Sequence, residues 1–192
     1  MKNVCITSAL RTAVGSMGKS LKNVCADELG ASVIQKTVID SKIPEHEVDE
    51  IIMGQVLTGG SGQNPARQAA IKSGIPKEKP AYIVNQVCGS GIRSIVSGFQ
   101  SINSEDSKIV IAGGQESMSQ APHAIHLRDG KKLGDVELID TMIKDGLWDA
   151  FHGYHMGITA ENVAEKFQIT RAEQDKFALR SQEKALEAQK QN

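Results

Sequence analysis

Short β-branched runs alternate with helical segments along the first part of the chain, and this alternation constrains the fold more than any other feature of the sequence. The strand-like runs cover residues 4–7, 49–56, 82–84 and 108–112. The helical segments between them cover residues 27–40, 66–72 and 92–102. A succession of strands and crossover helices is typical of a parallel sheet. The sequence therefore predicts an α/β fold.

Three helical segments carry more specific signals. Asn64 and Pro65 are predicted to cap and open the helix over 66–72. The segment from Ile92 to Ile102 has apolar residues at positions i, i+3, i+4, i+7 and i+10 and few charges, which predicts a buried helix. After a long irregular stretch over 115–157, two further helices are expected. Thr159 is a candidate cap for the first of them, and the capping box of Thr170-Arg171-Ala172-Glu173 opens the second.

Charge and cysteine content exclude several classes of protein. The 192 residues have a formal charge of −1, so no net field favours nucleic acid or an anionic membrane surface. No window reaches the roughly 18 apolar residues of a membrane span, and the N-terminus lacks a signal-peptide pattern. The three cysteines show no C-x2-C spacing, which argues against disulfides and a thiolate zinc site. We therefore expect a cytoplasmic protein with no nucleic-acid or membrane partner.

Cys88 lies between a predicted strand and a predicted helix, with Gly89 and Gly91 beside it. A helix N-terminus there would favour a thiolate, and the glycines would let a substrate or another backbone approach closely. An ordinary thiol is only about 3% ionised at pH 7, and half ionisation needs roughly 2 kcal/mol. A helix dipole supplies about 0.3–2 kcal/mol, so we expect a second activating group, a histidine, nearby. The alternative is that Cys88 is a small buried hydrophobe, which is the role expected for Cys5 and Cys25.

Two other clusters have competing interpretations. The pairs His123-x2-His126 and His152-x2-His155 could ligate a metal ion, but neither lies in a predicted helix, and loop histidines are usually solvated. The segment from Trp148 to Gly157 mixes aromatic, imidazole and thioether groups. It could form the wall of a pocket for an apolar arm, or a hydrophobic plug under a loop.

Four motifs, in one order and at one spacing, resemble those of the thiolases. They are Gly62-Gln63-Asn64-Pro65-Ala66-Arg67-Gln68, Asn85-Gln86-Val87-Cys88-Gly89-Ser90-Gly91, Gly113-Gly114-Gln115-Glu116-Ser117-Met118-Ser119 and Tyr154-His155-Met156-Gly157-Ile158-Thr159-Ala160-Glu161-Asn162. The resemblance implies a layered αβαβα fold made of two similar halves with an inserted loop domain. This chain would supply the N-terminal core half over 1–117 and the start of the loop domain over 118–192, without a C-terminal half.

The resemblance also implies a reaction. Cys88 would accept an acetyl group from acetyl-CoA as a thioester, and a second acetyl-CoA would attack it to give acetoacetyl-CoA, with thiolysis as the reverse. Gly89, His155 and Met156 would contact the substrate. No metal is implied, and no cofactor beyond the coenzyme A that is part of the substrate.

Association is implied as well. The segment from Ala121 to Gly134 resembles a loop through which bacterial thiolases form tetramers, and Gln63 to Arg67 lies near a dimer contact in the family. We therefore expect a homo-oligomer.

The chain departs from the family in one respect. The activating His of a Gly-His-Pro motif and the second Cys of a Cys-x-Gly-x-Gly motif come from the second half in thiolases, and this sequence contains neither motif. We expect the isolated 192 residues to be inactive. The alternatives are a non-catalytic thiolase-like protein that binds acyl-CoA or a partner, and a redox-sensing or metal-binding module.

Overall fold

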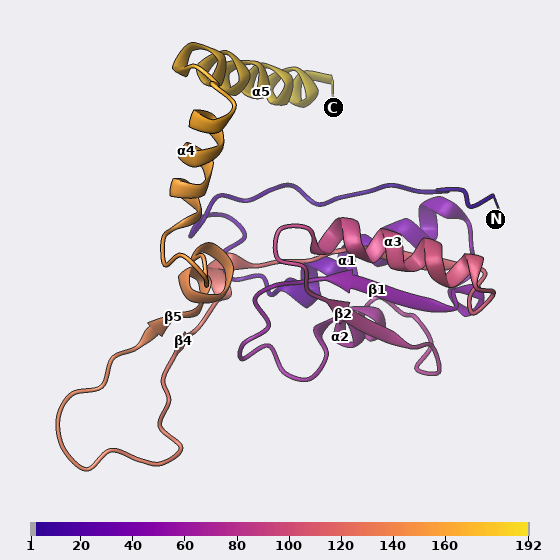
Figure 1. The fold of residues 1–192 in the computed structure, drawn as a ribbon. Coiled ribbons are helices and arrows are strands. Elements are labelled where there is room, and N and C mark those ends of the chain that lie inside the picture. Colours follow the sequence, from indigo (N-terminus) through magenta and orange to yellow (C-terminus); the bar gives the residue numbers. More distant parts are fainter. Residues whose placement is uncertain (1–2, 192) are drawn as a thin grey trace. The chain divides into compact units, whose positions relative to one another are not determined.

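The computed structural model describes residues 3–191 and consists of two compact units, which divide between Gly146 and Leu147. The first unit holds a parallel sheet with its helices, and the second holds two helices (Figure 1). The predicted α/β architecture is confirmed. The predicted domain boundary between residues 117 and 118 stays a prediction.

Three parallel strands form the main sheet in the order β2-β1-β3. They are β1 (Glu50–Gly54), β2 (Ala81–Val84) and β3 (Val110–Gly114). Ile51 of the central strand pairs with Ala81 on one side and with Ile111 on the other. The predicted runs at 49–56, 82–84 and 108–112 therefore form strands. The third strand continues through Gly113 and Gly114, where the sequence suggested its end.

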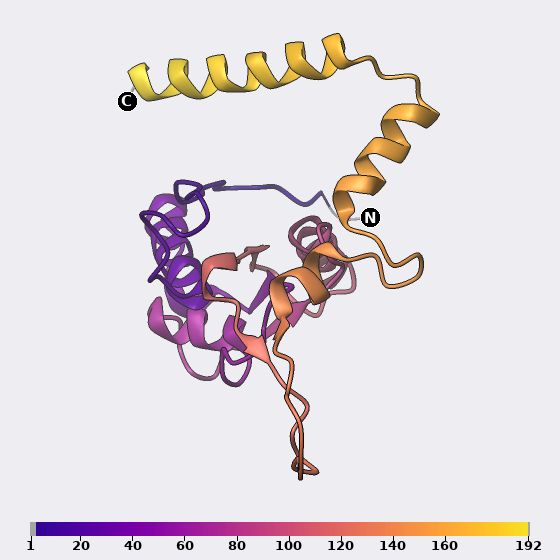
Figure 2. The same cartoon turned by 90° about the vertical axis from the view of Figure 1, so that its left-hand side faces the viewer.

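Helices cover both faces of this sheet. They are α1 (Ala26–Ser41), α2 (Pro65–Lys72) and α3 (Ser90–Asn103). Met53 points into the core formed with α1 and α2, whereas the neighbouring Gly54 faces α3, because successive strand residues point to opposite faces. Figure 2 shows α1 and α3 on either side of the strands. Asn64 accepts a hydrogen bond from the Arg67 amide at 3.1 Å, so the predicted cap of α2 is confirmed.

The apolar face of α3 points away from the sheet, so the prediction of a buried helix is wrong for that face. We define the α3 stripe as Ile92, Ile95, Val96 and Phe99, which are 69%, 45%, 37% and 43% exposed. The buried residues of the helix are Ser90, Ser94 and Gly98. A Cβ at Gly98 would come within 3.0 Å of Val110, so the sheet accepts only the small-residue face of the helix. The α3 stripe is therefore left largely exposed in the described part of the chain.

This exposed stripe leads us to expect that the isolated 192-residue chain self-associates, since large exposed apolar patches favour association. Replacing Ile95 or Phe99 with glutamate would place an unpaired charge in the packed contact and should shift the chain towards monomer. Analytical ultracentrifugation at tens of micromolar would measure the change. Ile39→Glu, which alters an exposed isoleucine on α1, is the matched control. A wild-type chain that sediments as a monomer would contradict the expectation.

The N-terminal segment contains no strand between residues 3 and 25, so the prediction at 4–7 is wrong. Ile6 is 78% exposed, and Cys5 and Cys25 are also exposed rather than buried. β-branched composition favours an extended backbone, but a strand also needs a neighbour to satisfy its amide and carbonyl groups. None of the strands described above pairs with this segment.

The irregular stretch after β3 contains short elements. They are a 3-10 helix, η2 (Met118–Gln120), and an antiparallel pair, β4 (His123–Ala124) with β5 (Ile139–Asp140). A π-helix, η3 (Met142–Leu147), follows β5. Another 3-10 helix of the first unit, η1 (Glu45–Glu47), lies before β1. The arm over 125–138 joins β4 to β5 (Figure 2), and Leu133 on it is 89% exposed. A role of Ala121 to Gly134 in association stays a prediction.

The second unit contains α4 (Met156–Lys166) and α5 (Arg171–Gln191). Thr159 does not cap α4, because His155 does so with its Nδ1, which accepts from the Gly157 amide at 3.0 Å. Histidine is not among the usual capping residues, so the sequence signal pointed to the wrong position. The predicted capping box of α5 is confirmed, since the Glu173 amide donates to the Thr170 hydroxyl and the Glu173 carboxylate accepts from the Thr170 amide. Within residues 3–191, no helix is long and apolar enough to span a membrane.

Candidate active site

Cys88 lies in the turn between the end of β2 at Val84 and the start of α3 at Ser90. Its side chain is exposed, so the interpretation of Cys88 as a buried hydrophobe is wrong. The turn lies at the carboxyl edge of the parallel sheet, where open α/β sheets bind their ligands. The start of α3 adds the positive potential of a helix N-terminus. The site therefore presents an accessible thiol beside the N-terminus of a helix.

The backbone of this turn is strained at Val87. This residue has a φ of 49°, in the left-handed region that a β-branched side chain rarely adopts. Such a conformation costs about 1–3 kcal/mol and persists only where the surroundings hold it. The Val87 amide donates to the Asn85 side chain at 2.9 Å, and the Gly89 amide donates to the Gln86 carbonyl at 3.0 Å. Val87, the residue before Cys88, is thus held by hydrogen bonds of the turn in a backbone conformation that is unfavourable for valine.

Gly54, at the end of β1, forms the floor beneath the turn. A Cβ at Gly54 would stand 2.4 Å from the carbonyl carbon of Ser90 and 2.6 Å from the Gly91 nitrogen. Those atoms belong to backbone, which cannot move aside as a flexible side chain would. The close approach of another backbone, expected from the glycines near Cys88, is therefore made from Gly54. A Cβ at Gly91 itself would meet nothing within 4 Å.

Gly89 is the N-cap residue of α3 and is half-buried. A Cβ there would lie 3.2 Å from the Gln86 carbonyl oxygen, so the turn also favours glycine at this position for steric reasons. Its predicted contact with substrate stays a prediction.

Polar side chains that sequence reasoning missed anchor the loops beside the turn. Glu116, after β3, accepts hydrogen bonds from the Val56 amide at 2.9 Å and the Leu57 amide at 3.2 Å. Burial raises the pKa of Glu116, and these two amides partly offset the effect. The buried side chains of Gln115 and Gln55 bond to each other at 2.9 Å. The sequence signals for this cluster are the polar residues directly after β1 and β3, and Gln115 and Glu116 also lie in the third of the four motifs.

His155 and Met156 belong to the second unit, whereas Cys88 belongs to the first. His155 caps α4, as described above, and Met156 is the first residue of that helix. Phe151, in the loop before them, is 93% exposed, so this segment is not a buried plug. The substrate contacts of His155 and Met156 stay predictions.

The histidine pairs do not converge on a metal site. His123 lies 3.9 Å from Asp140, and His152 lies 3.2 Å from Asp149. Backbone amides of His152 and Phe151 donate to Asp149 and lower the pKa of its carboxyl group. Within residues 3–191, no three His, Cys, Asp or Glu side chains gather to hold a metal ion.

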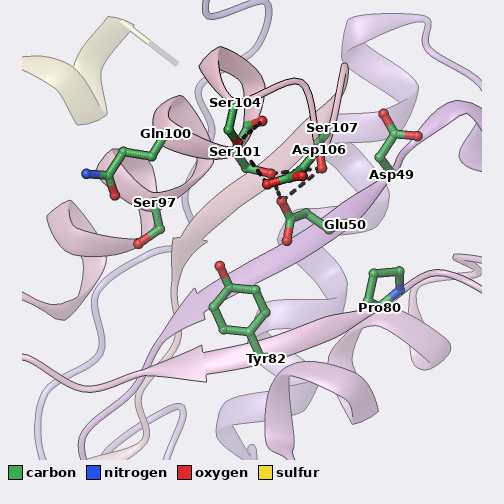
Figure 3. Close-up of a pocket in the computed structure, with 10 residues that line it drawn as sticks. All are labelled: Asp49, Glu50, Pro80, Tyr82, Ser97, Gln100, Ser101, Ser104, Asp106 and Ser107. Carbon is green, nitrogen blue, oxygen red and sulfur yellow. Dashed lines mark hydrogen bonds between the residues drawn. The ribbon is translucent and has the colours of Figure 1, made fainter.

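An open hollow of about 790 Å³ lies at the amino edge of the sheet, where β1 and β2 begin (Figure 3). Glu50 on its floor accepts hydrogen bonds from the hydroxyls of Ser101 and Ser107. Burial, followed by the Glu50 charge, raises the pKa of Tyr82 on its wall. The hollow is at the opposite edge from Cys88, so it is not part of the thiol site.

A family model of the thiolase N-terminal domain matches residues 4–192. The chain belongs to the thiolase family. This thiolase chain is 59% identical over 188 residues to the acetyl-CoA acetyltransferase of Rhizobium meliloti, a match that covers 98% of the chain and 48% of the relative. It is 51% identical over 187 residues to the cytosolic acetyl-CoA acetyltransferase of Mus musculus, covering 97% and 47%. The family expected from the four motifs is thereby confirmed.

A solved structure agrees with these relatives. The crystal structure of the Bacillus anthracis acetyl-CoA acetyltransferase matches with a TM-score of 0.91 and 40% identity, covering 97% of this chain and 47% of that chain. The expected thiolase fold is confirmed. The thiolase chain spans about half the length of the curated relatives that it matches.

Proposed function

We propose that this chain supplies the nucleophile for acyl transfer between two molecules of acetyl-CoA. The single observation that carries the proposal is the exposed Cys88 at the strand-to-helix turn, in a chain of the thiolase family. Acetyl-CoA is proposed as the substrate because the relatives are named acetyl-CoA acetyltransferases. The proposal applies to these residues in combination with a thiolase C-terminal half, with coenzyme A as part of the substrate and no further cofactor.

The reaction has two steps. The Cys88 thiolate attacks the thioester carbonyl of the first acetyl-CoA; the bond to CoA sulfur breaks, CoA leaves as a thiol after taking a proton, and acetyl-Cys88 remains. A second acetyl-CoA then loses a methyl proton to a base, and its carbanion attacks the acetyl-Cys88 carbonyl. A carbon–carbon bond forms, the Cys88 thiolate leaves, and acetoacetyl-CoA is released. Backbone N–H groups at the start of α3 are suited to stabilise the developing oxyanion.

Other parts of the proposal concern substrate contacts and assembly. We place Gly89, His155 and Met156 at the acyl and pantetheine end of the substrate. The base and the group that activates Cys88 would come from a second half, because this sequence lacks Gly-His-Pro and Cys-x-Gly-x-Gly motifs. We also propose a homo-oligomer in the cytoplasm, a location supported by the cytosolic mouse relative.

Labelling tests the proposal on a full-length form, in which residues 1–192 are followed by the second half of the Rhizobium meliloti relative. Incubation with acetyl-CoA labelled in the acetyl group, followed by peptide mapping, should find the label on Cys88. Cys5 and Cys25 are also exposed and serve as internal controls. Label on either of them in place of Cys88 would overturn the assignment. Binding of acetyl-CoA without any label would favour the non-catalytic alternative.

A further inference from the structure

Ser90 is buried directly beneath the exposed turn that carries Cys88. It is 4% exposed, although Val87 and Cys88 beside it are exposed. Its hydroxyl accepts a hydrogen bond from the Gln86 amide at 2.8 Å and donates one to the Val87 carbonyl at 2.6 Å. The side chain thus joins two points of the backbone on either side of the strained residue.

The second of these bonds controls the peptide group next to the thiol. The carbonyl of Val87 belongs to the peptide that joins Val87 to Cys88, and it also accepts from the Ser90 amide at 3.0 Å. The two bonds to the Ser90 hydroxyl fix the Gln86 amide and the Val87 carbonyl, so together they restrain both φ and ψ of Val87. A change in either torsion would turn the Cα–Cβ bond of Cys88 in another direction. Because Gly54 lies against the Ser90–Gly91 peptide, Ser90 itself has a rigid backing.

We propose that Ser90 is a positioning residue, whose hydroxyl holds Val87 in the left-handed region and thereby fixes the direction of the Cys88 thiol. The inference rests on the proposed function in that Cys88 is taken as the reacting group. Ser90 itself need not touch substrate, since it acts through the backbone of Val87.

Ser94, one turn further along α3, shows what a serine with a different role looks like. It is fully buried, and its hydroxyl donates to the carbonyls of Gly91 and Gly113, both at 2.7 Å. The bond to Gly113 joins α3 to β3, the bond to Gly91 lies within α3, and neither touches the turn over 85–88. Ser94→Ala is therefore a matched control: it removes a buried hydroxyl from the same helix without releasing Val87.

Val87→Gly provides the decisive comparison, because glycine adopts a positive φ at no steric cost. If Ser90 serves to hold Val87, its hydroxyl matters much less once residue 87 is glycine. If Ser90 only stabilises the helix, its removal has the same effect in both backgrounds. The double variant thus separates positioning from general stability.

The test measures alkylation by iodoacetamide on the 192-residue chain, as the rate at Cys88 divided by the rate at Cys25 in the same molecule. Ser90→Ala should lower this ratio by about two- to thirtyfold, the range that corresponds to losing a helix N-terminal contribution. In the Val87→Gly background, Ser90→Ala should lower the ratio by no more than about twofold. Ser94→Ala should leave the ratio unchanged. In the full-length form, Ser90→Ala should lower kcat by about 10- to 100-fold with little change in KM.

The proposal would be overturned if Ser90→Ala had the same Cys88/Cys25 alkylation ratio as wild type. It would also be overturned if Ser90→Ala lowered the ratio as much in the Val87→Gly background as in the wild-type background. A variant that unfolds is recognised because its three cysteines then react at similar rates. If Ser90→Ala alone unfolds, the effect of removing the hydroxyl is measured by comparing the double variant with Val87→Gly. Failure of the proposed function has a different signature. Acetyl label would be absent from Cys88 in the full-length form, while the alkylation ratios still follow the pattern above.

Discussion

Replacing Cys88 with serine should abolish acyl transfer in the full-length form, with a loss on the order of 10⁴-fold or more in kcat/KM. A serine hydroxyl stays protonated at neutral pH, whereas a thiol supplies some thiolate and is intrinsically a much better nucleophile. The fold should survive, because the side chain is exposed and serine is nearly the same size. Stability should therefore stay within about 0.5 kcal/mol of wild type.

The measurements are the rate of acetoacetyl-CoA thiolysis and the thermal unfolding curve of each variant. Cys25→Ser is the matched control, since Cys25 is exposed and also precedes a helix, as the N-cap residue of α1. It should retain activity close to wild type. Activity of Cys88→Ser within tenfold of wild type would remove Cys88 from the mechanism.

The isolated 192-residue chain should turn over acetoacetyl-CoA at less than about one thousandth of the rate of the full-length form. General acid–base catalysis by one positioned group contributes about 10²–10⁴-fold, and this chain lacks the motifs that carry the family's activating His and second Cys. Both forms are assayed at the same molar concentration of Cys88, so that the comparison reports the missing groups.

The control for this second experiment is a mixture in which the C-terminal half is added as a separate chain. Recovery of activity on mixing would show that the first half is competent and lacks only its partner. An isolated chain that works within tenfold of the full-length form would mean that the groups from the second half are dispensable.

The sequence was sufficient to predict much of the first unit, because local signals there agree with tertiary packing. The Asn64-Pro65 cap and the central strand from Glu50 to Gly54 are where pattern and turn chemistry place them. The α3 stripe shows where this reasoning fails. Apolar spacing identifies a helix and one of its faces, but that face need not be the one that meets the sheet. The small residues of α3 make that contact, which depends on how closely the backbones approach.

The site was predicted in the same partial way. The motif around Cys88 correctly indicated a thiol at a strand-to-helix junction. It did not reveal the strain at Val87 or the anchoring of the loops by Glu116, because both depend on hydrogen bonds whose partners a linear pattern does not specify. The prediction that Cys5 is buried was wrong for a related reason, because burial depends on which other segments pack against a residue.

The close contact at Gly54 limits what a sequence signature can tell about a relative of this chain. Gly54 is 34 positions before Cys88 and outside the motif that surrounds the thiol, yet one added methyl group there would press on the backbone of Ser90 and Gly91. A relative with an intact cysteine motif and an alanine at this position would therefore be classified as an active enzyme from its motif, although its nucleophilic cysteine would be displaced. Judging whether such a relative is functional requires reading the end of β1 together with the motif.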